Sequence, residues 1–351
     1  MNSWPLLYLL AIFLSFRLSR LHHRSLLAAL LAVVVFSVLL LRTAIRIPLH
    51  VKIECGKMSP SRIFTYEAVT GFFEHDMEPT GPEFRATLRP GLGLLERDYD
   101  TDAAFDPEKK KTQWARFVHF LEKKNEDSRG QVRHKLVFLS RHGQGFHNVK
   151  EAEVGRHEWD SYWSHQDGDE KMNWFDSFLT ETGKQQARDV HEFWLKSIDD
   201  FQMPTPELYY TSPHARCLET SKITYSGLDL PADRPFKPIV KEKLRERFGV
   251  HSCDRRRSMS WIASNYPDYT IEQGFTEEDK LWKADARETE EEIANRVKEF
   301  LGDVFNESDK AMVAFVCHSG FIRALYGVTK HSDVWIAAGA MVPLLLRAEA
   351  N

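Results

Sequence analysis

The stretch "KLVFLSRHGQGFHNV", residues 135–149, joins an apolar run to a polar turn. Leu136–Leu139 is a short run of large apolar residues, which predicts a buried strand. One residue, Ser140, separates the run from Arg141 and His142. Adjacent cationic side chains repel each other unless an anion lies between them. The stretch therefore predicts a strand with an anion-binding turn at its carboxyl end.

Two later segments have the same order of apolar run, polar turn and helical pattern. "ELYYT" (207–211) is followed by Ser212, Pro213 and then Arg216, and "MVAFV" (312–316) is followed by His318. Strands that alternate with helices predict an α/β domain with a mainly parallel sheet sandwiched by helices. Ligands of such sheets bind beyond the carboxyl ends of the strands. We therefore expect the three turns to meet at one edge.

The residues at this edge suit phosphoryl transfer through a covalent histidine. A neutral imidazole is a competent nucleophile when an acceptor holds its other ring nitrogen. The Arg141 and Arg216 guanidinium groups match phosphate oxygens in geometry and charge, without a metal. An arginine at the start of a helix is usually a solvated or paired surface residue, but His142, His318 and the two arginines together predict a phosphate site.

The segment "KLRERFGVHSCDRRRS", residues 243–258, supplies further candidates. Glu246 is the best candidate for an acid that protonates a leaving oxygen and then activates water, with a surface ion pair as the alternative. The basic run Arg255, Arg256 and Arg257 would hold further anionic parts of a substrate, or else form a solvated face.

Several motifs make the chain resemble the histidine phosphatase superfamily, in its phosphoglycerate mutase-like branch. The resemblance is closest to fungal phosphomutase-like proteins and their plant relatives, and covers about residues 62–349. The motifs are "RHGQGFHN" (141–148), "LTETGKQQA" (179–187), "SPHARCLET" (212–220), "LRERFGVHSCDRR" (244–256) and "CHSG" (317–320).

This resemblance implies a phosphoglycerate mutase-like fold and a role for each matched residue. His142 would be the phosphorylated nucleophile and Glu246 the acid. The implied phosphate-binding residues are Arg141, Asn148, Arg216 and His318. His147 matches no functional position, and we interpret it as a loop residue.

Composition limits the other possibilities. The chain has 351 residues, of which 42% are hydrophobic and 28% charged, with a net charge of −4. It therefore has ample material for a core, and lacks the basic footprint of a nucleic-acid-binding protein. The four cysteines are too few and too scattered for a disulfide framework or a zinc site. We expect no metal and no cofactor.

The N-terminal region contains a candidate membrane anchor. "SLLAALLAVVVFSVLLL", residues 25–41, is uncharged and as a helix would span about 25 Å, the short end of a bilayer crossing. A buried helix is the alternative. We expect a single-pass membrane protein, with the membrane and the orientation left open because basic residues flank both ends. Residues 1–24 would precede the anchor, 42–130 would form a linker and wrapping segment that includes a helix at 107–124, and 131–351 would be the catalytic domain.

These observations predict a metal-independent phosphomonoester hydrolase that acts through phosphohistidine on a small phosphorylated metabolite. Two alternatives remain open. One is a phosphomutase, which must shield the intermediate from water. The other is a catalytically idle, membrane-tethered protein that binds a phosphorylated ligand.

Overall fold

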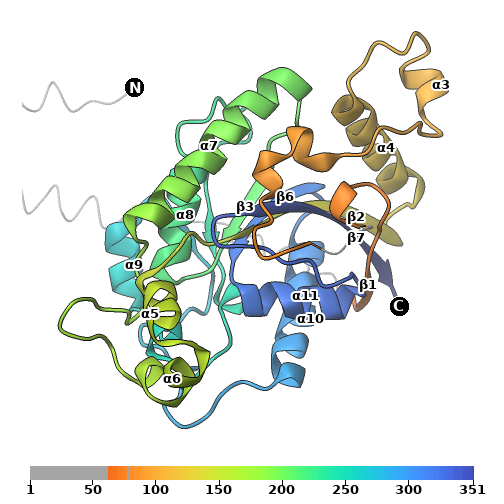
Figure 1. Ribbon diagram of the computed structural model, residues 1–351. Coiled ribbons are helices and arrows are strands. Elements are labelled where there is room, and N and C mark those ends of the chain that lie inside the picture. The colour runs from red at the N-terminus through yellow and green to blue at the C-terminus, as the bar shows by residue number, and fades with distance from the viewer. Residues whose placement is uncertain (1–61, 77–79) are drawn as a thin grey trace, which may run out of the picture. The chain divides into compact units, whose positions relative to one another are not determined.

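The computed structural model describes residues 62–76 and 80–351 (Figure 1). The predicted anchor at 25–41 lies outside these ranges, as do residues 1–24 and 42–61. Among the helices that the structure describes, none is both long and apolar enough to cross a membrane. The anchor stays a prediction.

A seven-stranded sheet forms the centre of the described part, in the order β1-β7-β2-β6-β3-β4-β5. Neighbouring strands from β2 to β5 in this order are parallel, whereas β7 is antiparallel to both β1 and β2. The predicted α/β fold with a mainly parallel sheet is confirmed. The strands are β1 (Phe64–Ala68), β2 (Val132–Arg141), β3 (Leu208–Thr211), β4 (Ile239–Val240), β5 (Thr270–Ile271), β6 (Met312–Cys317) and β7 (Met341–Ala350).

Helices cover both faces of this sheet (Figure 1). On one face, the Phe138 ring of β2 lies 4.9 Å from Trp194 and 6.5 Å from Trp114. On the other, the Phe315 ring of β6 lies 5.0 Å from Phe300. Helices α4 and α7 thus lie on the first face, and α10 on the second. The helices are α3 (Asp102–Phe105), α4 (Gln113–Asp127), α5 (Phe146–Val154), α6 (Arg156–Ser161), α7 (Glu181–Phe201), α8 (Ala215–Tyr225), α9 (Met259–Asn265), α10 (Glu290–Glu307) and α11 (Ser319–Thr329).

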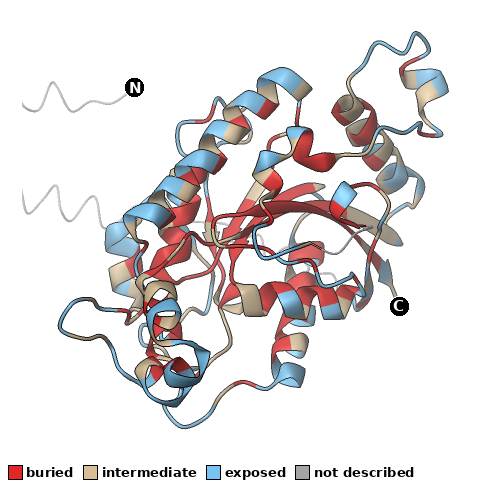
Figure 2. Ribbon diagram, in the orientation of Figure 1, coloured by how far each residue is buried: buried red, intermediate tan, exposed pale blue. Residues whose placement is uncertain are grey.

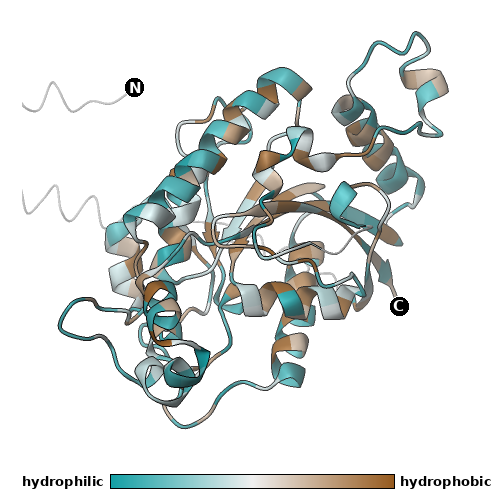
Figure 3. Ribbon diagram, in the orientation of Figure 1, coloured by the Kyte–Doolittle hydropathy of each residue, from teal (hydrophilic) through white to brown (hydrophobic). Residues whose placement is uncertain are grey.

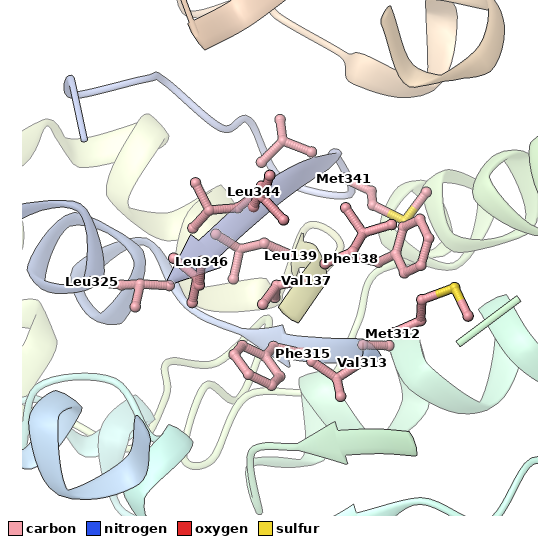
Figure 4. Packing of buried hydrophobic residues seen from close by; sticks show 14 of the residues in the cluster. Val137, Phe138, Leu139, Met312, Val313, Phe315, Leu325, Met341, Leu344 and Leu346 are labelled. Carbon is pink, nitrogen blue, oxygen red and sulfur yellow. The ribbon is translucent and has the colours of Figure 1, made fainter. Parts of the chain in front are cut away.

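Strand β2 lies at the centre of the core. Its residues from Lys135 to Ser140 are all buried, because helices cover both of its faces. Phe138 and Leu139 point to opposite faces, and Leu139 pairs with Phe315 in the parallel register (Figure 4). Figures 2 and 3 show that the central strands are both buried and apolar, while the outer helix surfaces are polar. The continuous apolar run in the sequence is therefore explained by burial on both sides.

The segment before β2 supplies parts of the main fold. Strand β1 pairs with β7 at one edge of the sheet, and α4 packs on β2. The helix predicted at 107–124 is observed at Gln113–Asp127. Its start is later because the Thr112 side chain caps it, and because the Asp106 carboxylate holds the preceding backbone amides in a loop.

Candidate active site

The register of the parallel strands brings the predicted turns together. Arg141 of β2 pairs with Cys317 of β6, and Thr211 of β3 pairs with Val316. The residues that follow these strands therefore lie side by side at one edge of the sheet. The His142 and His318 rings are 5.0 Å apart between centroids, in an edge-to-face arrangement.

The environment of His142 suits a nucleophile. Its Nδ1 lies 2.7 Å from the Gly143 carbonyl oxygen. A carbonyl oxygen only accepts, so Nδ1 carries the hydrogen and Nε2 keeps its lone pair. Burial lowers the pKa of His142 well below its ordinary value, and the nearby Arg216 guanidinium lowers it further. The ring is therefore neutral at physiological pH.

The two arginines are held in different ways. Arg216 is 1% exposed, donates to the Cys253 carbonyl at 2.7 Å, and pairs with Asp254 at 3.0 Å. Arg141 donates to the Ile336 carbonyl at 3.1 Å. Within the described ranges, no carboxylate lies within salt-bridge distance of Arg141. Arg141 thus has the less compensated charge of the two.

The second predicted histidine, His318, is the residue directly before helix α11. Its Nε2 lies 2.8 Å from the Ser212 hydroxyl at the end of β3. The first turn of α11 follows directly, and its backbone amides give this edge positive potential. Strands β3 and β6 therefore cooperate in orienting this imidazole.

Glu246 reaches the same helix terminus from the loop after β4. One carboxylate oxygen accepts a hydrogen bond from the Gly320 amide at 3.0 Å, and the other accepts one from the Arg247 amide at 3.0 Å. Gly320 is two residues after His318. The structure thus brings together Arg141, His142, Arg216, Glu246 and His318.

The chain is similar in sequence to known proteins. The family described as the histidine phosphatase superfamily (branch 1) matches residues 137–335. The chain belongs to this superfamily. It is 42% identical over 287 residues to "Probable phosphoglycerate mutase" of Arthroderma benhamiae, covering 82% of this chain and 85% of that protein. It is 37% identical over 217 residues to "Phosphomutase-like protein 3" of Candida albicans, covering 61% and 66%.

Among solved structures, a phosphoglycerate mutase from Bacillus anthracis is 18% identical, with a TM-score of 0.40, covering 62% of this chain and 90% of that one. The family match and the fungal relatives confirm the predicted membership of the histidine phosphatase superfamily, and the protein is an enzyme of that superfamily.

Asn148 lies in the first turn of α5 of this histidine phosphatase. Its side-chain oxygen accepts a hydrogen bond from the Gly145 amide at 3.0 Å, which caps the helix. This contact uses the side-chain oxygen, and the side-chain NH2 group stays available to donate to other groups.

Arg255 and Arg256 are neighbours in sequence with different surroundings. The Arg256 guanidinium pairs with Glu242 at 2.9 Å and donates to the Thr276 carbonyl at 2.8 Å, and its side chain is buried. Arg255 is exposed, and its guanidinium lies 5.7 Å from the Phe175 ring centroid. Both line a cavity of about 470 Å³, whose other wall residues are Phe175, Arg257, Ser258, Trp261, Glu278 and Asp279.

Sequence reasoning missed two further histidines of the site. His147, interpreted as a loop residue, lies in the first turn of α5, is buried, and has its ring 5.5 Å from that of His142. His214 is fully buried, and its ring lies 5.0 Å from that of His318. The signal for His214 was its place in "SPHAR", directly after a strand and two residues before Arg216.

One group of potential metal ligands occurs in the described residues. His251, Cys253 and Asp254 offer ligand atoms within 4.8 Å of one another. Asp254 already accepts from Arg216 and from Arg287, at 3.0 and 2.9 Å. Burial alone would raise the pKa of Asp254, but Arg287 and Arg216 outweigh it and hold the pKa below its usual range. A cation here would have to compete with two guanidinium groups, so the cluster fits a structural anchor for Arg216 better than a metal site.

Proposed function

We propose that the protein is a metal-independent phosphomonoesterase that works through phosphohistidine on a small phosphorylated metabolite. His142 Nε2 attacks phosphorus, and the bond to the leaving oxygen breaks as Glu246 gives that oxygen a proton. Water then attacks the phosphohistidine with Glu246 as the base. The nitrogen–phosphorus bond breaks, and inorganic phosphate leaves.

The observation that carries this proposal is the contact between His142 Nδ1 and the Gly143 carbonyl at 2.7 Å. This contact directs the proton to Nδ1 and the lone pair to Nε2. Burial and the Arg216 guanidinium also lower the pKa of His142, so the lone pair that attack on phosphorus requires stays on Nε2.

Electrostatics support the same chemistry. An Arg–phosphate contact near 4 Å contributes on the order of 4 kcal/mol at an effective dielectric of 20. Arg141 and Arg216 would together offset charge on the transferred group, and His318 adds a donor at the N-terminus of α11. Asn148 would add a further polar contact to the bound phosphate.

The 470 Å³ cavity is the best candidate for the rest of the substrate. Its wall residue Arg257 pairs with Asp176 at 3.0 Å, and Asp176 lies 3.1 Å from His214. Two polar contacts thus connect the cavity to the histidine cluster, which consists of His142, His147, His214 and His318. Arg255 stacks on aromatic rings and has no ion pair among the described residues, whereas Glu242 neutralises Arg256. We therefore infer a metabolite whose distal part is planar or carries a second negative charge.

The decisive experiment is a phosphoester screen combined with trapping of the intermediate. The wild type should release inorganic phosphate and carry acid-labile phosphate on histidine. His142→Ala should lose at least about 100-fold in kcat and trap none. His157→Ala, at an exposed histidine, is the matched control.

Each alternative gives a different result in this experiment. A phosphomutase would form an isomeric phosphate without net release of inorganic phosphate. An idle binding protein would bind phosphate without turnover of any ester in the panel.

A further inference from the structure

His214 and Asp176 form a fully buried pair that the proposed mechanism does not use. His214 Nδ1 lies 3.1 Å from Asp176 Oδ1, and both side chains have no exposed surface. The Asp176 carboxylate also accepts from the Ala215 amide at 3.0 Å and pairs with Arg257 at 3.0 Å. Burial alone would raise the pKa of Asp176, but its contacts with His214 and Arg257 lower it, so it is a carboxylate at neutral pH.

This carboxylate determines which nitrogen of His214 carries the hydrogen. An ionised carboxylate only accepts, so Nδ1 is the protonated nitrogen of the neutral ring. Nε2 lies at the opposite side of the imidazole. It is buried and has no hydrogen-bond partner in the ranges that the structure describes. The His214 ring lies 5.0 Å from the His318 ring, which is itself 5.0 Å from the His142 ring, so His214 lies beside the proposed catalytic histidines.

The charged side chains around the histidine cluster would neutralise a bound phosphate dianion only in part. Arg216 and Arg287 both face Asp254, and Arg257 faces Asp176. Unlike these three arginines, Arg141 has no carboxylate within salt-bridge distance in the described residues. The charged or titratable groups that act on His214 are Asp176, Arg216, Arg245, His147, His318 and Asp254.

His214 is neutral before phosphate binds. Burial, and then the Arg216 guanidinium, lower the pKa of His214 to about 4. An adjacent phosphate dianion acts in the opposite direction, because a nearby negative charge favours the protonated imidazole. A bare Nε2 lone pair would also repel a phosphate oxygen, whereas a protonated Nε2 donates to it.

We propose that His214 is a further phosphate ligand, which takes up one proton on Nε2 as the dianion enters and donates it as a charged hydrogen bond. Asp176 is the positioning residue that holds the ring through Nδ1. The proton comes from solution and returns there when phosphate leaves, and no other bond changes. This inference rests on the proposed function, since it assumes that phosphate binds beside His142.

Calorimetric titration of the full-length chain with inorganic phosphate tests the proposal. The titration is run at about pH 8 in two buffers that differ in ionisation enthalpy, which yields the number of protons taken up per phosphate. His214→Asn is the main variant, because its amide nitrogen can still donate to Asp176 from the position of Nδ1 but nothing replaces Nε2. His214→Gln places a donor that does not titrate near the position of Nε2. His191→Asn is the matched control, at a histidine whose Nδ1 bonds to the Thr224 carbonyl.

The expected difference between the wild type and His214→Asn is close to one proton per phosphate. The affinity of His214→Asn for phosphate should be about 10- to 100-fold lower than that of the wild type, as for a lost charge-assisted hydrogen bond. His214→Gln should regain part of the affinity without the proton, and His191→Asn should match the wild type. If the wild type and both His214 variants bind phosphate with equal proton uptake, His214 is structural and the inference is wrong. If the wild type binds no phosphate, the proposed function fails as well.

Discussion

The carboxylate of Glu246 accepts a 3.0 Å hydrogen bond from the backbone amide of Gly320, in the first turn of helix α11. The same turn begins at His318, so the proposed acid and the second histidine are fixed to one helix end. A Cβ atom at Gly320 would overlap the other oxygen of Glu246. The glycine therefore leaves the space in which the carboxylate lies.

Glu246→Gln should slow the hydrolysis of alkyl phosphates by about 10²–10⁴-fold, because a poor leaving group needs the proton. Transfer of the phosphoryl group from an activated aryl phosphate to His142 should be slowed little, because its leaving group needs little protonation. The two substrate classes are compared by kcat/KM, with the exposed Glu290→Gln as control. Equal losses on both classes would assign Glu246 a structural role.

Gly320→Ala should reproduce part of this loss, because the added methyl group displaces the Glu246 carboxylate. Melting temperature and kcat/KM on an alkyl phosphate are measured together. The control is Gly327→Ala in the same helix, where an added Cβ meets nothing within 4 Å. There, removing a glycine should stabilise the helix by about 0.5–1 kcal/mol. A fully active Gly320→Ala would show that the position of Glu246 matters little.

Arg255→Ala should raise the KM of substrates with a second anionic group about 3- to 10-fold, since exposed ionic and aromatic contacts are individually modest. A simple aryl phosphate should keep its KM. Arg188→Ala, at an exposed arginine of α7, is the control. An unchanged KM for every anionic substrate in the panel would show that the cavity does not bind the substrate.

Chelation should leave turnover intact. The positive charge at the proposed phosphate site comes from Arg141, Arg216 and the imidazoles, and Asp254 of the candidate ligand cluster is held by two arginines. Activity is measured before and after dialysis against EDTA. Loss of turnover that a divalent metal restores would contradict the mechanism.

We also propose that residues 25–41 anchor the chain in a membrane. The full chain should then stay in the membrane fraction after a high-salt or alkaline carbonate wash. Salt would release a protein held by charge alone, because it screens exposed charges beyond about 8–10 Å. Removal of residues 1–45 should give a soluble and active enzyme. A full chain in the soluble fraction, or an aggregated truncation, would identify the apolar segment as a buried helix.

The sequence by itself determined the three central strands and the side chains that follow them. Strands β2, β3 and β6 are short apolar runs that end directly on polar turns, and burial on both faces requires such runs. Because parallel strands end at a common edge, the convergence of His142, Arg216 and His318 followed from chain order alone. Helix α10 begins with a capping box that Thr289 and Glu292 form at its N-terminus.

Only the tertiary structure decided the features that depend on long-range contacts. The partner of His214 is a carboxylate 38 positions earlier in a loop, where no periodicity marks it. Strand β7 contains Pro343 and is inserted between β1 and β2, a pairing that no local pattern encodes. The local sequence does not distinguish adjacent arginines such as Arg255 and Arg256. Whether each is neutralised depends on carboxylates and carbonyls brought from distant segments, because an ion pair is set by distance in space rather than by position in the chain.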